Sequence, residues 1–318
     1  MNKFLLVAIA YVKSMRPYTF FVTGTAGILG IVAVGDVILS GRNILVLILL
    51  FSSYGINQVI NDLLGRKEDK YNAPMRPLVS GELTKKNAIF VTLILFIFGA
   101  IGTYFLNPWA LVIYFLAYLM NFIYEHLKGI PFLGNIWFGF MIALAPLFGA
   151  MAVAGYDFGQ IVNDRSLLSL AVLVAASSSA LCYYTFFKDY EGDRIAGKKT
   201  AIVALGLKRV RYLNLPISLL PFLLLAFFIS FGFLNFGNNI IFLILAAAAF
   251  FFCQYAAIYT FNHLDRSQKA LELNFECVPL FFCSLIALFD AWLGAIIFIL
   301  SFVLVKSFYF LMYRKKFY

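Results

Sequence analysis

The feature that most constrains this chain is a series of apolar runs, each long enough to cross a lipid bilayer as a helix. These runs lie at residues 17–39, 44–64, 88–106, 109–127, 132–154, 167–188, 213–235 and 239–262. A helix rises about 1.5 Å per residue and the hydrocarbon layer is about 30 Å thick, so about 20 apolar residues suffice. Because the runs are apolar on all sides and do not alternate with period two, they favour helices over a barrel of strands. The sequence therefore predicts an integral membrane protein with an all-α fold, a multi-span transmembrane helical bundle.

The last apolar stretch, from residue 275 to residue 313, is too long to cross the bilayer once. We expect it to break near residues 290–294, which gives nine spans, or ten. With nine, the basic tail Arg314-Lys315-Lys316 would face outward, whereas a tenth span or a re-entrant segment would return it to the cytoplasm. Both alternatives stay open at this point.

The distribution of basic residues predicts the orientation in the membrane. Lys3, Lys13 and Arg16 precede the first run, and later bases cluster after the second, fourth, sixth and eighth runs. The positive-inside rule places these segments in the cytoplasm. The formal net charge of +10 follows from such loops and gives no indication of a nucleic-acid partner. We expect residues 1–15 to form an interfacial helix and residues 1–318 to form a single membrane domain, embedded in the cell's inner (cytoplasmic) membrane.

The four cysteines, Cys182, Cys253, Cys277 and Cys283, lie in or beside apolar runs. None has the spacing of a metal ligand set, so we interpret them as small apolar side chains.

Two polar segments stand out, at residues 61–83 and 183–200, each at the predicted cytoplasmic end of a run. If the preceding helix continues, Asp62 and Asp69 lie two turns apart on one face, and Asp189 and Asp193 lie one turn apart on another. Two converging pairs of carboxylates suit a hard divalent cation, and Mg²⁺ prefers a few carboxylates together with waters and phosphate oxygens. The segments therefore predict a Mg²⁺ and polyphosphate site facing a central cavity open to the cytoplasmic side.

Neighbouring side chains extend this hypothesis, each with a structural alternative. Bases that could meet the remaining phosphate charge are Arg66, Lys67, Arg76, Lys188, Arg194 and Lys198. Asn57 either faces the cavity or bonds across helices, and Tyr124 and Tyr184 are either cavity residues or interfacial aromatics. An isolated Asp at a helix end would more often be a solvated or capping residue, but the paired spacing argues otherwise. Glu125 is expected to be solvated.

The motifs together resemble those of the UbiA superfamily of intramembrane prenyltransferases. Its first motif, NDxxDxxxD followed by RPLxSG, is met by Asn61, Asp62, Asp69 and the segment "MRPLVSGEL". Its second, DxxxD within "DxxGDxxxG", is met by Asp189, Asp193 and Gly197, and its YxxxK pattern by "YEHLK", Tyr124 to Lys128. One departure is Gly65, which stands where the family usually has the middle Asp of the first motif; Glu68 is nearby but about 100° round the helix from Asp69.

The resemblance implies a Mg²⁺-dependent prenyltransferase that ionises an allylic isoprenoid diphosphate within the membrane and transfers the chain to a hydrophobic or aromatic acceptor. It implies that Asp62, Asp69, Asp189 and Asp193 are the catalytic, Mg²⁺-binding residues. It implies a diphosphate site made of Asn61, Arg66, Arg76, Tyr124, Lys128, Lys188, Arg194 and Lys198, with Asn57 and Tyr184 as cavity candidates. We rank a lipid or quinone-precursor acceptor first, a terpene cyclase without any acceptor second, and a cation-binding transporter as a more distant alternative, because its ionisable groups would lie near the bilayer midplane.

Overall fold

The computed structural model describes residues 3–36 and 40–313, and within them every regular element is a helix. The predicted basic tail Arg314-Lys315-Lys316 lies outside these residues. The α-helices are α1 Lys3–Met15, α2 Phe20–Ala33, α3 Gly41–Leu64, α4 Arg66–Asn72, α5 Pro77–Ser80, α6 Lys85–Leu106, α7 Pro108–Leu127, α8 Leu133–Ala154, α9 Phe158–Asn163, α10 Arg165–Ile195, α11 Ala201–Leu205, α12 Leu207–Val210, α13 Asn214–Ser230, α14 Ile240–Asn262, α15 Ser267–Ile286 and α16 Ala291–Tyr313. Three short 3₁₀ turns join them, η1 Pro17–Thr19, η2 Arg211–Leu213 and η3 Leu264–Arg266.

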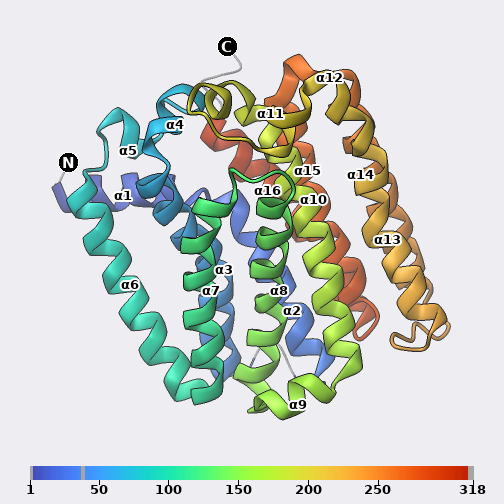
Figure 1. The fold of residues 1–318 in the computed structure, drawn as a ribbon. Helices are drawn as coiled ribbons and strands as arrows, with labels where there is room; N and C mark the ends of the chain where they lie inside the picture. Colours follow the sequence, from blue (N-terminus) through green and yellow to red (C-terminus); the bar gives the residue numbers. More distant parts are fainter. Residues whose placement is uncertain (1–2, 37–39, 314–318) are drawn as a thin grey trace.

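In the described part of the chain, eight helices are long and apolar enough to cross a membrane. A ninth span results if Phe4–Met15 and Pro17–Ala33, which meet at a bend of 43°, are taken as one. The prediction of an all-α, multi-span bundle is confirmed. Figure 1 shows α1 lying across one end of the bundle, while α2 enters it.

The C-terminal stretch breaks as predicted, though slightly earlier in the chain. Helix α15 ends at Ile286, residues 287–290 form the turn, and α16 begins at Ala291. Helix α15 is buried against α2, α10, α14 and α16, but it carries charged side chains and is not among the eight apolar helices. The two halves are therefore separate, adjacent helices.

Close packing between α2 and α8 forms the centre of the bundle. A Cβ atom at Gly30 would overlap the carbonyl of Pro146, and one at Gly149 would overlap the carbonyl of Gly27. Small residues at helix interfaces let backbones approach closely in membranes, where dispersion contacts carry much of the stability. The glycines thus allow α2 and α8 to meet, and α8 then supports α10 along its length.

The polar segments gather at the end of the bundle where α1 lies. In Figure 1 the helices α4, α5, α11 and α12 all lie at this end, whereas α9 lies at the opposite end. The second predicted loop differs from expectation, because α10 continues as a helix to Ile195 and carries Asp189 and Asp193 on its last two turns. Both acidic motifs are consequently held on helices that rise out of the bundle core.

Candidate active site

A polar chamber lies at this end of the bundle and has about 930 Å³ of empty volume, its open mouth included. Its walls come from the junction of α1 and η1, the end of α3, α4, the residue before α5, the end of α7, α8, the last turns of α10, α15 and the end of α16. The residues that line it include six acids and four bases, so its formal charge is −2 when all are ionised. The acids are Asp62, Glu68, Asp69, Glu125, Asp189 and Asp193, and the bases are Arg16, Arg76, Lys128 and Lys188.

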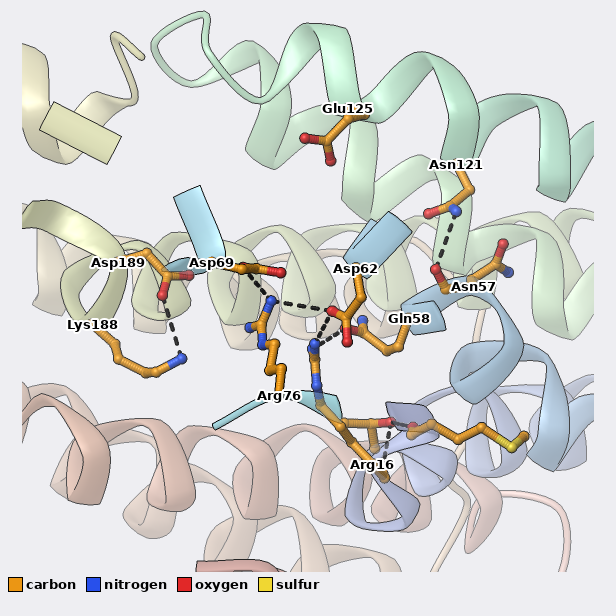
Figure 2. Close-up of polar contacts among 12 residues, drawn as sticks. Arg16, Asn57, Gln58, Asp62, Asp69, Arg76, Asn121, Glu125, Lys188 and Asp189 are labelled. Carbon is orange, nitrogen blue, oxygen red and sulfur yellow. Dashed lines mark hydrogen bonds and ion pairs between the residues drawn. The ribbon is translucent and has the colours of Figure 1, made fainter. Parts of the chain in front are cut away.

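The first motif meets two arginines inside the chamber (Figure 2). Arg76 Nη1 lies 3.1 Å from Asp62 Oδ1 and also contacts Asp69 Oδ1. Arg16 donates to Asp62 Oδ1 and to Gln58 Oε1. Although α3 ends at Leu64 and α4 begins at Arg66, the backbone hydrogen bonds continue through Gly65, so both carboxylates still face the same guanidinium.

Each of these two carboxylates keeps one oxygen without a partner. Asp62 is 1% exposed and Asp69 is 7% exposed, yet Oδ2 of each is buried and accepts no hydrogen bond. The same holds for Asn61 Oδ1 and Glu125 Oε2. A buried acceptor without a donor is costly, so these oxygens mark places where a cation or another donor would be stabilised.

Burial and ion pairing oppose each other at this cluster. Burial raises the pKa of Asp69, although Arg76 works in the opposite direction. Burial disfavours the charge of Arg76, but Asp62 and Asp69 outweigh it and raise the pKa of that guanidinium. Arg76 therefore stays charged and neutralises part of the acidic cluster.

The second motif is tied directly to the first. Asn72, at the end of α4, accepts a hydrogen bond of 2.9 Å from the backbone N–H of Gly192 on α10. A Cβ at Gly192 would overlap the Asn72 side chain, so the glycine is needed for this approach. Asp189 and Asp193 line the chamber on either side of this contact, and Lys188 Nζ lies 3.3 Å from Asp189 Oδ1. The two acidic pairs therefore face one space, as predicted.

A third wall comes from the end of α7. Glu125 Oε1 pairs with Lys128 Nζ at 2.5 Å and with Lys198 Nζ at 3.0 Å, and Lys198 also pairs with Glu68 at 2.6 Å. Burial opposes the charge of Lys198, but Glu125 and Glu68 raise its pKa. The prediction that Glu125 is solvated is wrong, because its side chain is only 9% exposed and lines the chamber.

The predicted side chains are not all brought together. Arg66 and Arg194 are exposed and do not line the chamber, and Arg194 pairs instead with Glu191 at the surface. Tyr184 lines a separate small pocket between α10, α13, α14 and α15, where its hydroxyl donates to the carbonyl of Asn214 at 2.7 Å. The structure thus keeps these three side chains away from the chamber.

Asn61, Tyr124, Lys128 and Lys188 line the chamber, and the ammonium group of Lys198 reaches its rim through Glu125 and Glu68. The hydroxyl of Tyr124 lies 3.4 Å from Cys182 Sγ.

An apolar pocket of about 680 Å³ adjoins the chamber on the bundle side. It lies between α3, α7 and α8, and it shares Tyr54, Gln58, Asn61 and Phe138 with the chamber. Asn57 lines this pocket, and its backbone carbonyl accepts a hydrogen bond of 3.4 Å from Asn121. A ligand with a charged head and an apolar tail therefore fits the combined space.

Sequence reasoning did not assign several chamber residues to the site, among them Arg16, Gln58, Glu68, Asn72 and Glu125 and the aromatic residues Tyr54 and Phe138. The position of Arg16, directly before Pro17 and the first apolar run, could have suggested a role in the site. A basic residue there is also expected from the positive-inside rule, so its position alone did not distinguish the two. Its backbone adds a second signal in the structure, because φ is 55°, a conformation rare for a residue with a side chain and common at functional sites. Gln58 lies one turn before Asp62 on α3, so helical spacing could have found it, whereas Asn72 and Glu125 are recognised only once α4, α7 and α10 are packed together.

The chamber fits a metal ion only together with another oxygen donor. Among residues 3–36 and 40–313, no group of three or more Asp, Glu, His or Cys side chains is close enough to enclose a metal alone. However, buried carboxylate and amide oxygens without partners are the ligands that Mg²⁺ prefers, and phosphate oxygens commonly complete its shell. The residues present therefore fit Mg²⁺ bound with a phosphate-bearing ligand.

Comparison with known proteins identifies the family to which this chain is similar. A model of the UbiA prenyltransferase family matches residues 20–286. A digeranylgeranylglyceryl phosphate synthase from Thermococcus kodakarensis is 33% identical over 207 residues, which cover 64% of this chain and 72% of the relative. One from Methanosarcina mazei is 27% identical over 279 residues, or 83% of this chain and 93% of the relative.

Solved structures share the fold. A UbiA homologue from Aeropyrum pernix K1 in its apo form superposes with a TM-score of 0.69 at 18% identity, covering 83% of this chain and 94% of that one. A homologue from Archaeoglobus fulgidus bound to DMAPP and Mg²⁺ gives a TM-score of 0.66 at 17% identity, covering 91% and 98%. The match of the family model to residues 20–286 confirms the family resemblance inferred from the motifs.

Proposed function

The chain belongs to the UbiA prenyltransferase family, and from this premise we propose that it transfers an isoprenoid chain from an allylic diphosphate to a phosphate-bearing lipid, with Mg²⁺ as its cofactor. The prediction that the protein is a membrane prenyltransferase is confirmed by the family, whereas donor and acceptor belong to this proposal. The acceptor we favour is a glyceryl phosphate lipid that already carries an isoprenoid chain. The names of the relatives support it, since a digeranylgeranylglyceryl phosphate has two such chains on one glyceryl phosphate.

The observation that carries the proposal is an acidic chamber joined to an apolar pocket through shared wall residues. An apolar tail of an isoprenoid gains about 25 cal/mol for each Å² that it removes from water, so the pocket suits it. A diphosphate alone would be repelled by the chamber's excess of acids over bases, which remains when Lys198 at the rim is counted, and divalent cations would reverse that repulsion. The charge pattern therefore favours binding of the diphosphate together with metal.

Four carboxylates would hold the Mg²⁺, those of Asp62, Asp69, Asp189 and Asp193. When bound, Mg²⁺ supplies positive charge that stabilises the diphosphate as it leaves. Lys128, Lys188 and Lys198 have ammonium groups at the chamber wall or rim that can donate hydrogen bonds to phosphate oxygens.

The bond between the allylic carbon and the diphosphate oxygen breaks, and its electron pair leaves with the diphosphate. The acceptor hydroxyl then forms the new carbon–oxygen bond and releases its proton. Tyr54 and Phe138 stand between chamber and pocket with their rings 6.2 Å apart, at the point where charge would develop on carbon. Aromatic faces stabilise a cation, and the surrounding helices exclude water that would capture it.

The test is pyrophosphate release by the full chain in lipid nanodiscs with Mg²⁺ and geranyl, farnesyl or geranylgeranyl diphosphate. We expect release to require geranylgeranylglyceryl phosphate and to yield a product with one additional chain. Release that requires an aromatic quinone precursor would overturn the lipid acceptor. Release without any acceptor, giving a hydrocarbon, would establish a cyclase instead.

Two substitutions test the metal-binding role in the same assay. Asp62→Asn and Asp193→Asn should each lower release by about 100-fold or more, since removing a group that stabilises developing charge costs that much. Asp157→Asn is the matched control, because Asp157 caps α9 at the far end of the bundle and Asn caps a helix equally well. Unchanged release in the first two variants would refute the metal site.

We also propose that residues 1–318 form one domain in the cell's inner membrane, with the chamber facing the cytoplasm. The basic segments that follow the second, fourth, sixth and eighth predicted runs support this orientation. The exposed Lys67, replaced by Cys, should react with a membrane-impermeant maleimide only after the cytoplasmic side becomes accessible. Labelling in intact cells would reverse the orientation.

A further inference from the structure

Gly65 stands at the point where the chamber walls formed by α3 and α7 meet. Its φ of −90° and ψ of 19° are open to residues with side chains, so the backbone conformation does not require glycine. A Cβ built at this position would lie 3.1 Å from the Asn61 carbonyl oxygen, 3.4 Å from Lys128 Nζ and 3.5 Å from Glu125 Oε1. The Glu125 carboxylate therefore borders the space that a side chain at position 65 would enter.

Glu125 reaches this space from a different helix and is held there firmly. Two lysines, Lys128 and Lys198, both pair with its Oε1, at 2.5 and 3.0 Å. Its other oxygen, Oε2, is buried and has no partner, although the side chain is only 9% exposed. A buried charged oxygen without a donor is unfavourable unless a ligand completes it.

The chamber aspartates show the same arrangement. Arg16 and Arg76 contact Oδ1 of Asp62, and Arg76 contacts Oδ1 of Asp69, which leaves Oδ2 of both aspartates without a partner. Figure 2 shows Glu125 on the other side of the aspartates from Arg16. Three carboxylates from α3, α4 and α7 thus each present one unpartnered oxygen in a single chamber.

We propose that Glu125 is a cation ligand of the chamber and supplies, from α7, the carboxylate that α3 lacks at Gly65. The inference rests on the proposed function, since the cation is the one that accompanies the diphosphate. Oxygen ligands of a divalent cation come readily from separate elements, because the cation selects for charge and distance and not for sequence position. Lys128 and Lys198 then act as positioning residues that keep the carboxylate at this place before the cation arrives.

The experiment measures Mn²⁺ affinity by the electron paramagnetic resonance signal of free Mn²⁺, with full-length protein in nanodiscs and inorganic pyrophosphate present. Glu125→Gln should weaken Mn²⁺ binding by about tenfold or more, since loss of even an outer partner of a metal ligand costs that much. Glu191→Gln is the control, because Glu191 pairs with Arg194 at the surface and does not line the chamber, so it should change the affinity by less than about twofold.

A double variant moves the carboxylate back to α3. Glu125→Ala with Gly65→Asp frees the space beside position 65 and places an acid there, and it should recover Mn²⁺ affinity relative to Glu125→Ala alone. Helical circular dichroism and a single elution peak establish that each variant is folded.

Equal affinity of Glu125→Gln and the unchanged protein would overturn the proposal, as would an equal loss in Glu191→Gln, which would show that removing any acidic charge has the same effect. Failure of the double variant to regain affinity would overturn the assignment to position 65. If the unchanged protein binds no Mn²⁺ with pyrophosphate, the proposed function itself fails, which is a distinct result.

Discussion

Replacing Arg76 with Met should destabilise the ligand-free protein by about 3 kcal/mol, the lower end of the cost of breaking a buried ion pair. The guanidinium contacts Asp62 and Asp69, whose side chains are 1% and 10% exposed, while that of Arg76 is 19% exposed. Without it, Asp62 retains Arg16, but Asp69 keeps no ion pair within the described part of the chain. The lower end of this free-energy range applies because the Arg76 side chain retains some contact with solvent.

The loss should depend on pH with a definite sign. Burial already raises the pKa of Asp69, and Arg76 opposes that rise, so its removal raises the pKa further. A carboxyl whose folded-state pKa exceeds its unfolded value binds a proton on folding, and its stability contribution increases as pH falls through the folded pKa. The difference between Arg76→Met and the unchanged protein should therefore shrink from pH 7 towards pH 5.

Reversible unfolding in mixed detergent micelles, followed by circular dichroism at both pH values, measures these differences. Arg194→Met is the control, because Arg194 belongs to a surface pair with Glu191 and should cost at most about 1 kcal/mol. Equal stability of the two variants at pH 7 would show that the acidic cluster does not depend on Arg76. A loss that stays constant between pH 7 and pH 5 would remove Asp69 as its cause.

Two further predictions concern residues outside the chamber. Gly30→Ala should cost about 1–3 kcal/mol in the same assay, since its Cβ would overlap the Pro146 carbonyl, whereas Gly41→Ala, with open space around it, should not destabilise. Tyr184→Phe should cost about 1 kcal/mol through its lost hydrogen bond to Asn214, yet leave pyrophosphate release unchanged. Slower release at unchanged stability would bring Tyr184 into the reaction path.

The membrane spans were predictable because hydrophobicity is a local property of the chain. The run at 132–154 corresponds to α8, Leu133–Ala154, almost residue for residue. The run at 167–188 predicted the end of its helix less accurately. Helix α10 continues through polar residues to Ile195, where the contact between Asn72 and Gly192 holds it against α4. The apolar pattern of the sequence ends at the membrane boundary, whereas the helix continues beyond it as long as packing contacts stabilise it.

The motif carboxylates could also be found from spacing, since residues four or seven apart share a helix face. Exposure could not be found this way. Glu125 was expected to be solvated. Arg66 and Arg194 were expected in the site, because each lies close to an acidic motif along the chain. In the structure the pairing of Glu125 with Lys198, 73 residues away, buries it.

The amino-acid sequence alone was therefore enough for the helices, their apolar character and the acids that define the family, all of which depend on neighbours within a few turns. Tertiary structure decided which charges face one another, as in the contacts of Arg16 with Asp62 and of Asn72 with Gly192. Such contacts join segments far apart in the chain. Their energies depend on distance and burial, and those quantities exist only once the helices are packed.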